Sequence, residues 1–203
     1  MPTPTRAEFH DLARRYTVVP VWRELVADLI TPVAAFARLC ADDEPGFLFE
    51  SVEHGERWSR WSFVGRRPVA TFTARGRAVT VDGDVPSSIP LDAGILAAIE
   101  EALACFRSPQ LAELPPLHSG LVGFLGYDVV REVEKLPSDA VDDRGFPDAT
   151  MSIIGELAAF DHFRQRVTLV ANAWIPADPT DAQIDAAYDD AVSRLEQLAV
   201  DGA

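Results

Sequence analysis

The sequence contains few cysteines and has no surplus of basic residues. Its two cysteines, Cys40 and Cys105, lie in apolar helical patterns, which favours two buried thiols in a reducing compartment over a disulfide framework. Lysine and arginine together number 18, against 32 aspartates and glutamates, so the formal net charge is -14. Because phosphate binding needs a basic face, this balance argues against nucleic acid as a partner.

Long apolar runs are also missing. No segment approaches membrane-spanning length, and residues 1–16 have the interleaved charges of a capped helix rather than the apolar core of a signal peptide. We therefore expect a cytoplasmic protein that does not bind a membrane. With 203 residues, 48% of them hydrophobic, the chain can build one sizeable core, and we expect a single domain over residues 1–203.

The residue spacings of common catalytic and metal sites are absent from the sequence. The four histidines, at positions 10, 54, 118 and 162, have neither the i, i+4 pairing nor the cysteine partners of a metal site, and each is predicted to be a surface or turn residue. No glycine-bounded nucleophile elbow appears. The acidic residues within 142–148 are ordinary loop and cap residues. We predict no catalytic residue, metal ligand or cofactor site in this chain.

Gly120, Gly123 and Gly126 form the one glycine-rich motif, but their spacing matches neither the dinucleotide fingerprint nor the P-loop. Glycines in a buried strand instead allow another backbone to come close. We therefore expect a buried strand at residues 120–125, followed by a helix at 127–135.

Helical periodicity and capping residues predict four further helices. Thr5 and Glu8 have capping-box spacing, and Thr31 with Pro32 begins a second helix. The predicted helices are 5–15, 33–41 with Val33, Phe36, Ala37 and Cys40 on one face, 94–106 with Ile95, Leu96, Ile99, Leu103 and Phe106 buried, and 180–199.

Alternating patterns and turn residues predict strands at 18–25, 47–53, 58–64, 69–75 and 78–81, then a long hairpin of 151–161 with 166–174. The run from 47 to 81 reads as one antiparallel meander. The predicted fold class is α+β, an antiparallel β-sheet flanked by helices.

Polar residues interrupt the apolar pattern of two neighbouring strands. Glu50 and Ser51 end an apolar run, and the second strand carries Arg60, Trp61 and Ser62. Such a set could hold a zwitterionic aromatic ligand, with a carboxylate for its ammonium, hydroxyls and a guanidinium for its carboxylate, and an indole for stacking. The alternative is a salt-bridged strand end without a ligand.

Several motifs, spread over nearly the whole chain, resemble the N-terminal region of component I of anthranilate synthase, the chorismate-using subunit of tryptophan biosynthesis. Each motif is weak alone, and together they are specific. They are Val19-Pro20-Val21, Arg23-Glu24-Leu25, Asp28, Thr31-Pro32-Val33, residues 47–53, 60–65 and 120–128, Pro147-Asp148, Phe160-Asp161-His162 and residues 169–172.

The resemblance implies an assignment for the polar strand ends. In that family the leucine-glutamate-serine segment lines the feedback site for L-tryptophan, which here points to Glu50 and Ser51, with Arg60, Trp61 and Ser62 as a weaker carry-over. Phe47 and Phe49 stand where leucines are usual. The resemblance also implies half of the family's orthogonal β-sandwich.

The family's chorismate and magnesium residues belong to a C-terminal catalytic domain, which this sequence does not contain. The resemblance therefore implies a regulatory part that is inactive alone. In the whole enzyme, chorismate and ammonia from a glutamine amidotransferase subunit give anthranilate and pyruvate with Mg²⁺. An apolar face that normally meets the other half would favour a homodimer.

Two other functions stay open. The chain could be a structural scaffold that docks the amidotransferase and shapes the catalytic domain without binding an effector. It could also be the equivalent part of aminodeoxychorismate synthase component I, in the folate pathway, although the 47–53 and 60–65 segments look more like the anthranilate enzyme.

Overall fold

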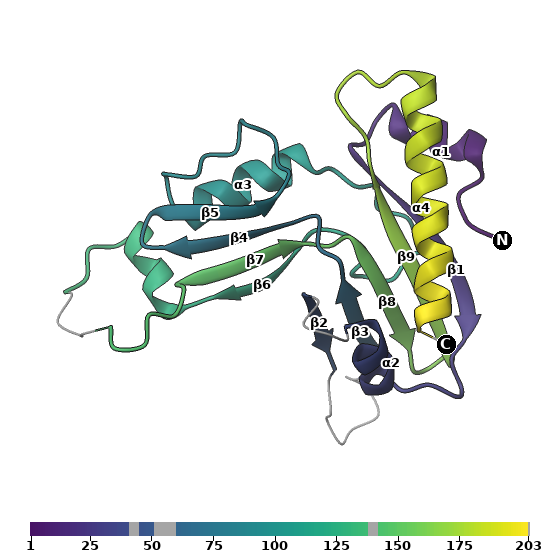
Figure 1. Cartoon of the computed structure of the whole chain (residues 1–203), viewed down its shortest axis with the longest axis horizontal. Helices are drawn as coiled ribbons and strands as arrows, with labels where there is room; N and C mark the ends of the chain where they lie inside the picture. The colour runs from purple at the N-terminus through teal and green to yellow at the C-terminus, as the bar shows by residue number, and fades with distance from the viewer. Residues whose placement is uncertain (41–44, 51–59, 138–141, 203) are drawn as a thin grey trace. The chain divides into compact units, whose positions relative to one another are not determined.

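A computed structural model describes the chain apart from residues 41–44, 51–59, 138–141 and 203 (Figure 1). The chain forms two compact units. Unit 1 comprises Met1–Pro68, Phe106–Gly120 and Ile154–Ala203, and unit 2 comprises Val69–Cys105 and Leu121–Ile153. Each unit has an antiparallel sheet with helices, which confirms the α+β class. A single regulatory domain over residues 1–203 stays a prediction.

Unit 1 is built on a five-stranded sheet in which every neighbouring pair is antiparallel. Its central strand β8 is buried along its whole length, as expected for a strand covered on both faces. β8 and β9 form the predicted hairpin. In spatial order the strands are β1 (Val18–Val26), β9 (Arg166–Trp174), β8 (Glu156–Asp161), β3 (Trp61–Arg66) and β2 (Gly46–Phe49).

Three helices pack on one face of this sheet, which we call the helix face: α1 (Arg6–Ala13), α2 (Pro32–Leu39) and α4 (Asp181–Asp201). Figure 1 shows α4 lying along β9 and β1. α1 begins with the predicted capping box of Thr5 and Glu8, and α4 begins with a second one at Thr180. Such boxes satisfy amides that the first helical turn leaves unpaired.

The core of unit 1 lies between the helix face and these helices. Strand residues on this face, such as Val64 and Leu169, pack with Ile184, Leu195 and Leu198 of α4. The 3.6-residue period of α4 brings its apolar residues onto one stripe, which the sheet then buries.

A buried ion cluster ties the end of α4 to this sheet. Arg66 is 4% exposed; its Nε donates to Glu156 Oε2 at 2.7 Å and its Nη1 to Asp201 Oδ2 at 2.7 Å. Glu156 is fully buried. The hydrogen bond from Arg66 holds the pKa of Asp201 below its ordinary value. Because an unpaired charge is costly to bury, each member depends on the others.

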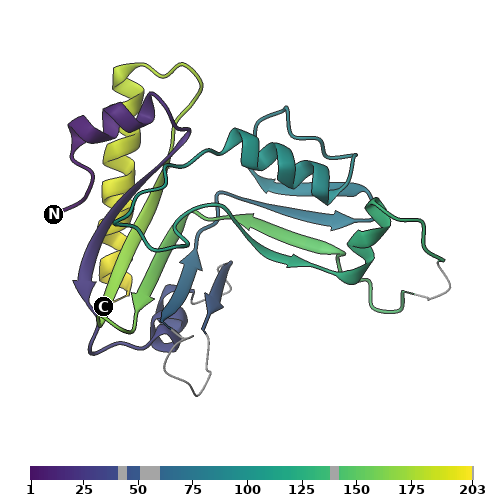
Figure 2. The same cartoon turned by 180° about the vertical axis from the view of Figure 1, so that it is seen from behind.

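Unit 2 is a four-stranded antiparallel sheet with α3 (Ile95–Cys105) packed on β4 and β5 (Figure 2). The carboxylate of Glu132 accepts hydrogen bonds from the amides of Ile95 at 2.7 Å and Leu96 at 3.0 Å, at the beginning of α3. Glu132 ends a short 3-10 helix, η1 (Tyr127–Glu132). The strands, in spatial order, are β5 (Ala78–Gly83), β4 (Ala70–Arg75), β7 (Ala149–Ile153) and β6 (Leu121–Leu125).

The predicted meander over residues 47–81 is wrong. β2 and β3 pair in the sheet of unit 1, whereas β4 and β5 pair in the sheet of unit 2. The predicted strand 151–161 is likewise two strands, β7 and β8, interrupted at Ile154 and Gly155. A local pattern predicts that a segment is extended but does not specify its partner.

The structure also differs from three predictions about helix and strand faces, although Ile95 of α3 is buried as predicted. In α2 the buried residues are Pro32, Ala35 and Leu39, while Val33 is 54% exposed. In α3 the buried residues are Ile95, Ala98 and Ala102, while Leu103 is 52% exposed. β6 was predicted to be buried, but it is an edge strand on which Phe124 and Leu125 are about half exposed. Alanines are thus among the buried residues of both helices, beside larger side chains.

Candidate functional site

The predicted ligand residues lie around the edge pair β2 and β3. Phe49 pairs with Phe63, and Phe47 pairs with Gly65 across the two strands. Phe47 and Phe49 lie on the same side of β2, and their rings are 5.0 Å apart between centroids. A Cβ on Gly65 would lie 2.1 Å from Phe47 Cε1, so glycine is required for the Phe47 ring to cover this strand.

A cavity of about 380 Å³ lies beside these strands. Trp61 and Phe63 lie along it with stacked rings, 6.2 Å between centroids and 15° between planes. Both side chains are partly exposed, and Phe49 is 46% exposed. We call this the aromatic pocket, and its lining residues are Leu48, Phe49, Glu50, Trp61, Phe63 and Leu117.

Glu50 follows directly after β2 and lines the aromatic pocket with an exposed side chain. In a continuous strand Glu50 would point to the same side as Leu48, which packs against the core. β2 ends at Phe49, so this alternation does not apply to Glu50. It is the only charged side chain among the lining residues in the described part of the chain. The pocket thus offers aromatic surface with one carboxylate, a combination suited to an aromatic ammonium compound.

Arg60 lies next to the pocket but is already bound within the chain. Its Nε and Nη2 donate to the Asp161 carboxylate at 3.1 and 2.6 Å, and its guanidinium carbon lies 4.9 Å from the Trp61 ring centroid. Asp161, 5% exposed in its side chain, also accepts from the amides of Phe163 and Arg164. The hydrogen bonds from Arg60 lower the pKa of Asp161.

Ser62 lies on the opposite side of β3 from Trp61, because successive side chains of a strand point to opposite faces. It is 1% exposed, and its Oγ is 2.8 Å from His162 Nε2. Ser51 falls outside the described residues. The structure therefore brings together Glu50 and Trp61, attaches Arg60 to Asp161 at the border of the pocket, and separates Ser62 from them.

Phe63 and Leu117 are among the pocket residues that were not predicted from the sequence. Phe63 was quoted only as part of a motif, although its spacing of two from Trp61 is the signal for a shared strand face. Leu117 comes from a distant loop, and no local pattern indicates that it reaches this edge.

The histidine prediction is wrong for His118. It is 4% exposed, and its Nδ1 and Nε2 lie 3.2 and 3.1 Å from the carbonyl oxygens of Pro115 and Pro109. Its backbone oxygen accepts from Asn172 Nδ2 at 3.0 Å. His118 therefore holds the 106–120 segment together rather than facing solvent. His54 lies outside the described residues.

Close backbone approach accounts for Gly123 and Gly126, as predicted, but not for Gly120, where no atom would lie within 4 Å of a Cβ and the φ of 111° favours glycine instead. A Cβ on Gly123 would lie 1.9 Å from the Thr150 oxygen of the neighbouring strand, and one on Gly126 would lie 2.8 Å from the Asp148 oxygen. Asp142 accepts from the amides of Arg144 and Gly145, as in an ordinary loop turn.

The chain is similar over almost its whole length to three curated proteins, each named anthranilate synthase component 1. It is 43% identical to the protein of Mycolicibacterium smegmatis over 196 residues, which are 97% of this chain and 37% of that protein. It is 43% identical to that of Mycobacterium tuberculosis over 200 residues (97% and 38%), and 37% identical to that of Arthrobacter globiformis over 197 residues (97% and 37%).

The chain is homologous to the N-terminal region of anthranilate synthase component 1. It spans about 37% of the length of these curated relatives. A crystal structure of anthranilate synthase component I from Streptococcus pneumoniae TIGR4 aligns with 85% of this chain and 36% of its own, at 20% identity and a TM-score of 0.49. No family model matches the chain.

Two negative findings concern the described residues. None of the helices between residues 1 and 202 is long and apolar enough to span a membrane. Within the same described residues, no three histidine, cysteine or acidic side chains lie close enough together to hold a metal ion.

Proposed function

We propose that this chain is the tryptophan-sensing part of an anthranilate synthase component I, with the aromatic pocket as its share of the effector site. The observation that carries the proposal is the carboxylate of Glu50 beside the stacked rings of Trp61 and Phe63. An indole can stack on these rings while the ligand's ammonium meets Glu50.

The size of the pocket supports a ligand of this class. About 380 Å³ is within the range of small-molecule sites, and an amino acid with an indole side chain is a small member of that range. In this proposal Ser51 follows Glu50 and supplies a hydroxyl to the ligand carboxylate. Arg60 covers the Trp61 ring and keeps its ion pair with Asp161.

The proposed role extends to the whole enzyme. There a C-terminal catalytic domain, with Mg²⁺, would convert chorismate and ammonia from a glutamine amidotransferase subunit to anthranilate and pyruvate. Tryptophan would inhibit by binding one of two arrangements of the enzyme more tightly than the other. The aromatic pocket would then be one wall of a site completed by that domain.

A scaffold without effector binding is the second candidate function. It is favoured by the hydrogen bonds that Arg60 and Ser62 make within the chain, to Asp161 and His162, because groups so engaged are less available to a ligand. A third candidate is the corresponding part of aminodeoxychorismate synthase component I, which acts in the folate pathway. The product formed by a full-length parent enzyme would distinguish this candidate from anthranilate synthase. A homodimer stays a prediction, testable by sedimentation.

Calorimetric titration of L-tryptophan into the 203-residue chain tests the sensor function. We expect saturable binding, weakened at least about tenfold by Glu50→Gln or Ser51→Ala because each removes a charged or hydroxyl contact. Ser62→Ala is the matched control, since Ser62 lies on the other face of β3 and its loss should leave the affinity unchanged. L-Phenylalanine, which lacks the indole N–H, should compete weakly.

Other outcomes have definite meanings. No binding by a folded chain, repeated with a full-length parent enzyme, would contradict the sensor function and favour the scaffold. Binding that is lost in Ser62→Ala but kept in Glu50→Gln would place the ligand away from the aromatic pocket. Tryptophan binding seen only in the full-length parent would mean that the second wall is needed.

A further inference from the structure

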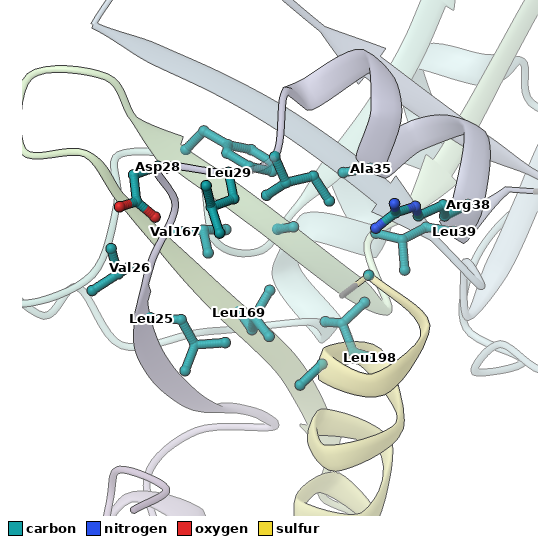
Figure 3. Close-up of a pocket in the computed structure, with 15 residues that line it drawn as sticks. Leu25, Val26, Asp28, Leu29, Ala35, Arg38, Leu39, Val167, Leu169 and Leu198 are labelled. Carbon is teal, nitrogen blue, oxygen red and sulfur yellow. The ribbon is translucent and has the colours of Figure 1, made fainter.

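A second cavity, of about 440 Å³, lies on the helix face of the unit 1 sheet (Figure 3). Its floor is formed by Ala158 and Phe160 of β8 with Leu169 of β9, and its sides by Leu39 of α2 and Leu198 of α4. These five side chains are at most 5% exposed, so the floor and sides belong to the stable core. We call this cavity the helix-face pocket.

The helix-face pocket is separate from the aromatic pocket. Ala158 pairs with Val64 and Phe160 with Ser62, whereas the aromatic pocket is lined by Trp61 and Phe63. Because side chains alternate along a strand, these two sets point to opposite faces of the same sheet. No residue lines both pockets.

Small residues keep this cavity open. Ala35 of α2, Ala158 of β8, Ala199 of α4 and Gly202 after α4 all line it, so the two bordering helices and β8 each contribute a short side chain. Protein interiors normally close-pack to within about one methyl group, so a cavity of this size departs from ordinary packing. Its walls carry far more apolar than polar groups.

The charges around the cavity are asymmetric. Arg38, in the last turn of α2, lies on one side with its guanidinium turned towards the cavity, and Asp28 lies on the opposite side (Figure 3). An anionic group would therefore be attracted to the Arg38 side and repelled from the Asp28 side. This gives an elongated ligand one preferred orientation.

The mouth of the cavity carries exposed apolar side chains. Leu29, which lies above the cavity in Figure 3, is 96% exposed, and Val26 is 59% exposed. Large apolar residues held in solvent at a pocket mouth favour an apolar occupant, which would cover them. The apolar floor, the mouth and the single guanidinium thus favour one class of ligand.

We propose that the helix-face pocket binds a small amphipathic carboxylate, with an apolar body of about ten carbons over Phe160 and Leu169 and its head group at Arg38. A decanoate-like acid has this chemistry. The ligand joins α2 to the end of α4, because residues of both helices line the cavity. No covalent step is involved.

The test is titration of sodium decanoate, below its aggregation concentration, into the 203-residue chain, followed by calorimetry and by amide shifts in NMR spectra. We expect saturable binding at one site, with the largest shifts in Ala158, Leu169 and Leu198. Decanol should bind at least about tenfold more weakly, since it keeps the body of the ligand and loses the charge.

Three variants make the test specific. Arg38→Gln should weaken decanoate at least about tenfold and leave decanol unchanged, whereas Arg131→Gln, which removes an arginine of unit 2 that does not line the pocket, should change neither. Ala199→Phe should fill the cavity and abolish the binding of both compounds. Its fold is checked by its NMR spectrum, and Arg38→Gln tests the proposal even if Ala199→Phe does not fold.

Two results would overturn the proposal. Equal affinities for decanoate and decanol, both unaffected by Arg38→Gln, would show nonspecific apolar binding. Loss of decanoate binding in Glu50→Gln, with Arg38→Gln unchanged, would assign the acid to the aromatic pocket. The test is independent of the sensor function, because decanoate binding is predicted to depend on Arg38 and Ala199, whereas tryptophan binding is predicted to depend on Glu50 and Ser51.

Discussion

The two faces of the unit 1 sheet differ in how fully other elements cover them. The helix face is covered by α1, α2 and α4, and its core side chains are nearly all buried. At the β2 edge the other face keeps Phe49, Trp61 and Phe63 partly exposed. The difference indicates that the helix face, apart from the helix-face pocket, mainly provides stability, whereas the aromatic edge keeps aromatic surface that can bind a ligand.

The largest expected effect is on the helix face. Arg66→Ala should lower the free energy of unfolding by about 3–5 kcal/mol, because it leaves the buried Glu156 with only the Arg67 guanidinium, 3.9 Å away, and removes the hydrogen-bonded cation of Asp201. Urea unfolding would measure the loss. Arg60→Ala, at the other face, should cost clearly less, since Arg60 is 47% exposed and Asp161 keeps two backbone donors. Equal losses would contradict the difference between the faces.

Truncating a large apolar side chain should also lower the free energy of unfolding more on the helix face than at the aromatic edge. Leu195 of α4 is fully buried, so Leu195→Ala should cost about 2–5 kcal/mol, measured by urea unfolding. Phe49→Ala removes a larger side chain from the exposed edge and should nevertheless cost less. If Phe49→Ala proved the more damaging change, the aromatic edge would be part of the core.

Acid should weaken both faces through their carboxylates. The folded-state pKa values of Asp201 and Asp161 are lowered, mainly by Arg66 and Arg60 respectively. Their stabilising contribution is therefore complete above the unfolded-state pKa of about 3.9 and is lost as pH falls through the lower folded value. The stability gap between the native chain and Asp201→Asn should shrink below about pH 4. Unfolding midpoints at several pH values would measure it, and a constant gap would contradict this account.

The smallest effect concerns adjacent residues of β3. Ser62→Ala removes one hydrogen bond to His162 and should cost about 1 kcal/mol. Because Ser62 points away from Trp61, the tryptophan fluorescence of the aromatic pocket should stay unchanged. A shifted emission spectrum would mean that the two faces are coupled through this strand.

Much of the local structure could be predicted from sequence. Thr5 with Glu8 and Thr31 with Pro32 gave the correct helix starts, because caps depend on residues close in sequence. The predicted neighbouring strands 69–75 and 78–81 do pair, and the φ of 55° at Gly76 explains why glycine is needed in the turn between them.

What could not be predicted depends on distant partners. The division of residues 47–81 between two sheets is decided by β7 and β8, which come more than 60 positions later. For the site, Glu50 and Trp61 were predicted and do line one pocket. The engagement of Arg60 with Asp161 could not be foreseen, because these residues are separated by 101 positions.

The order of the strands in unit 1 also bears on how the chain folds. β1 pairs along its whole length with β9, so the first strand to be synthesised must wait for one of the last. The local hairpin of β8 and β9 can form early, whereas the pairing of β1 closes a long loop and is expected to be slow. During synthesis the apolar β1 therefore remains unpaired until about residue 174 has emerged, and this interval is when the nascent chain is most exposed to aggregation.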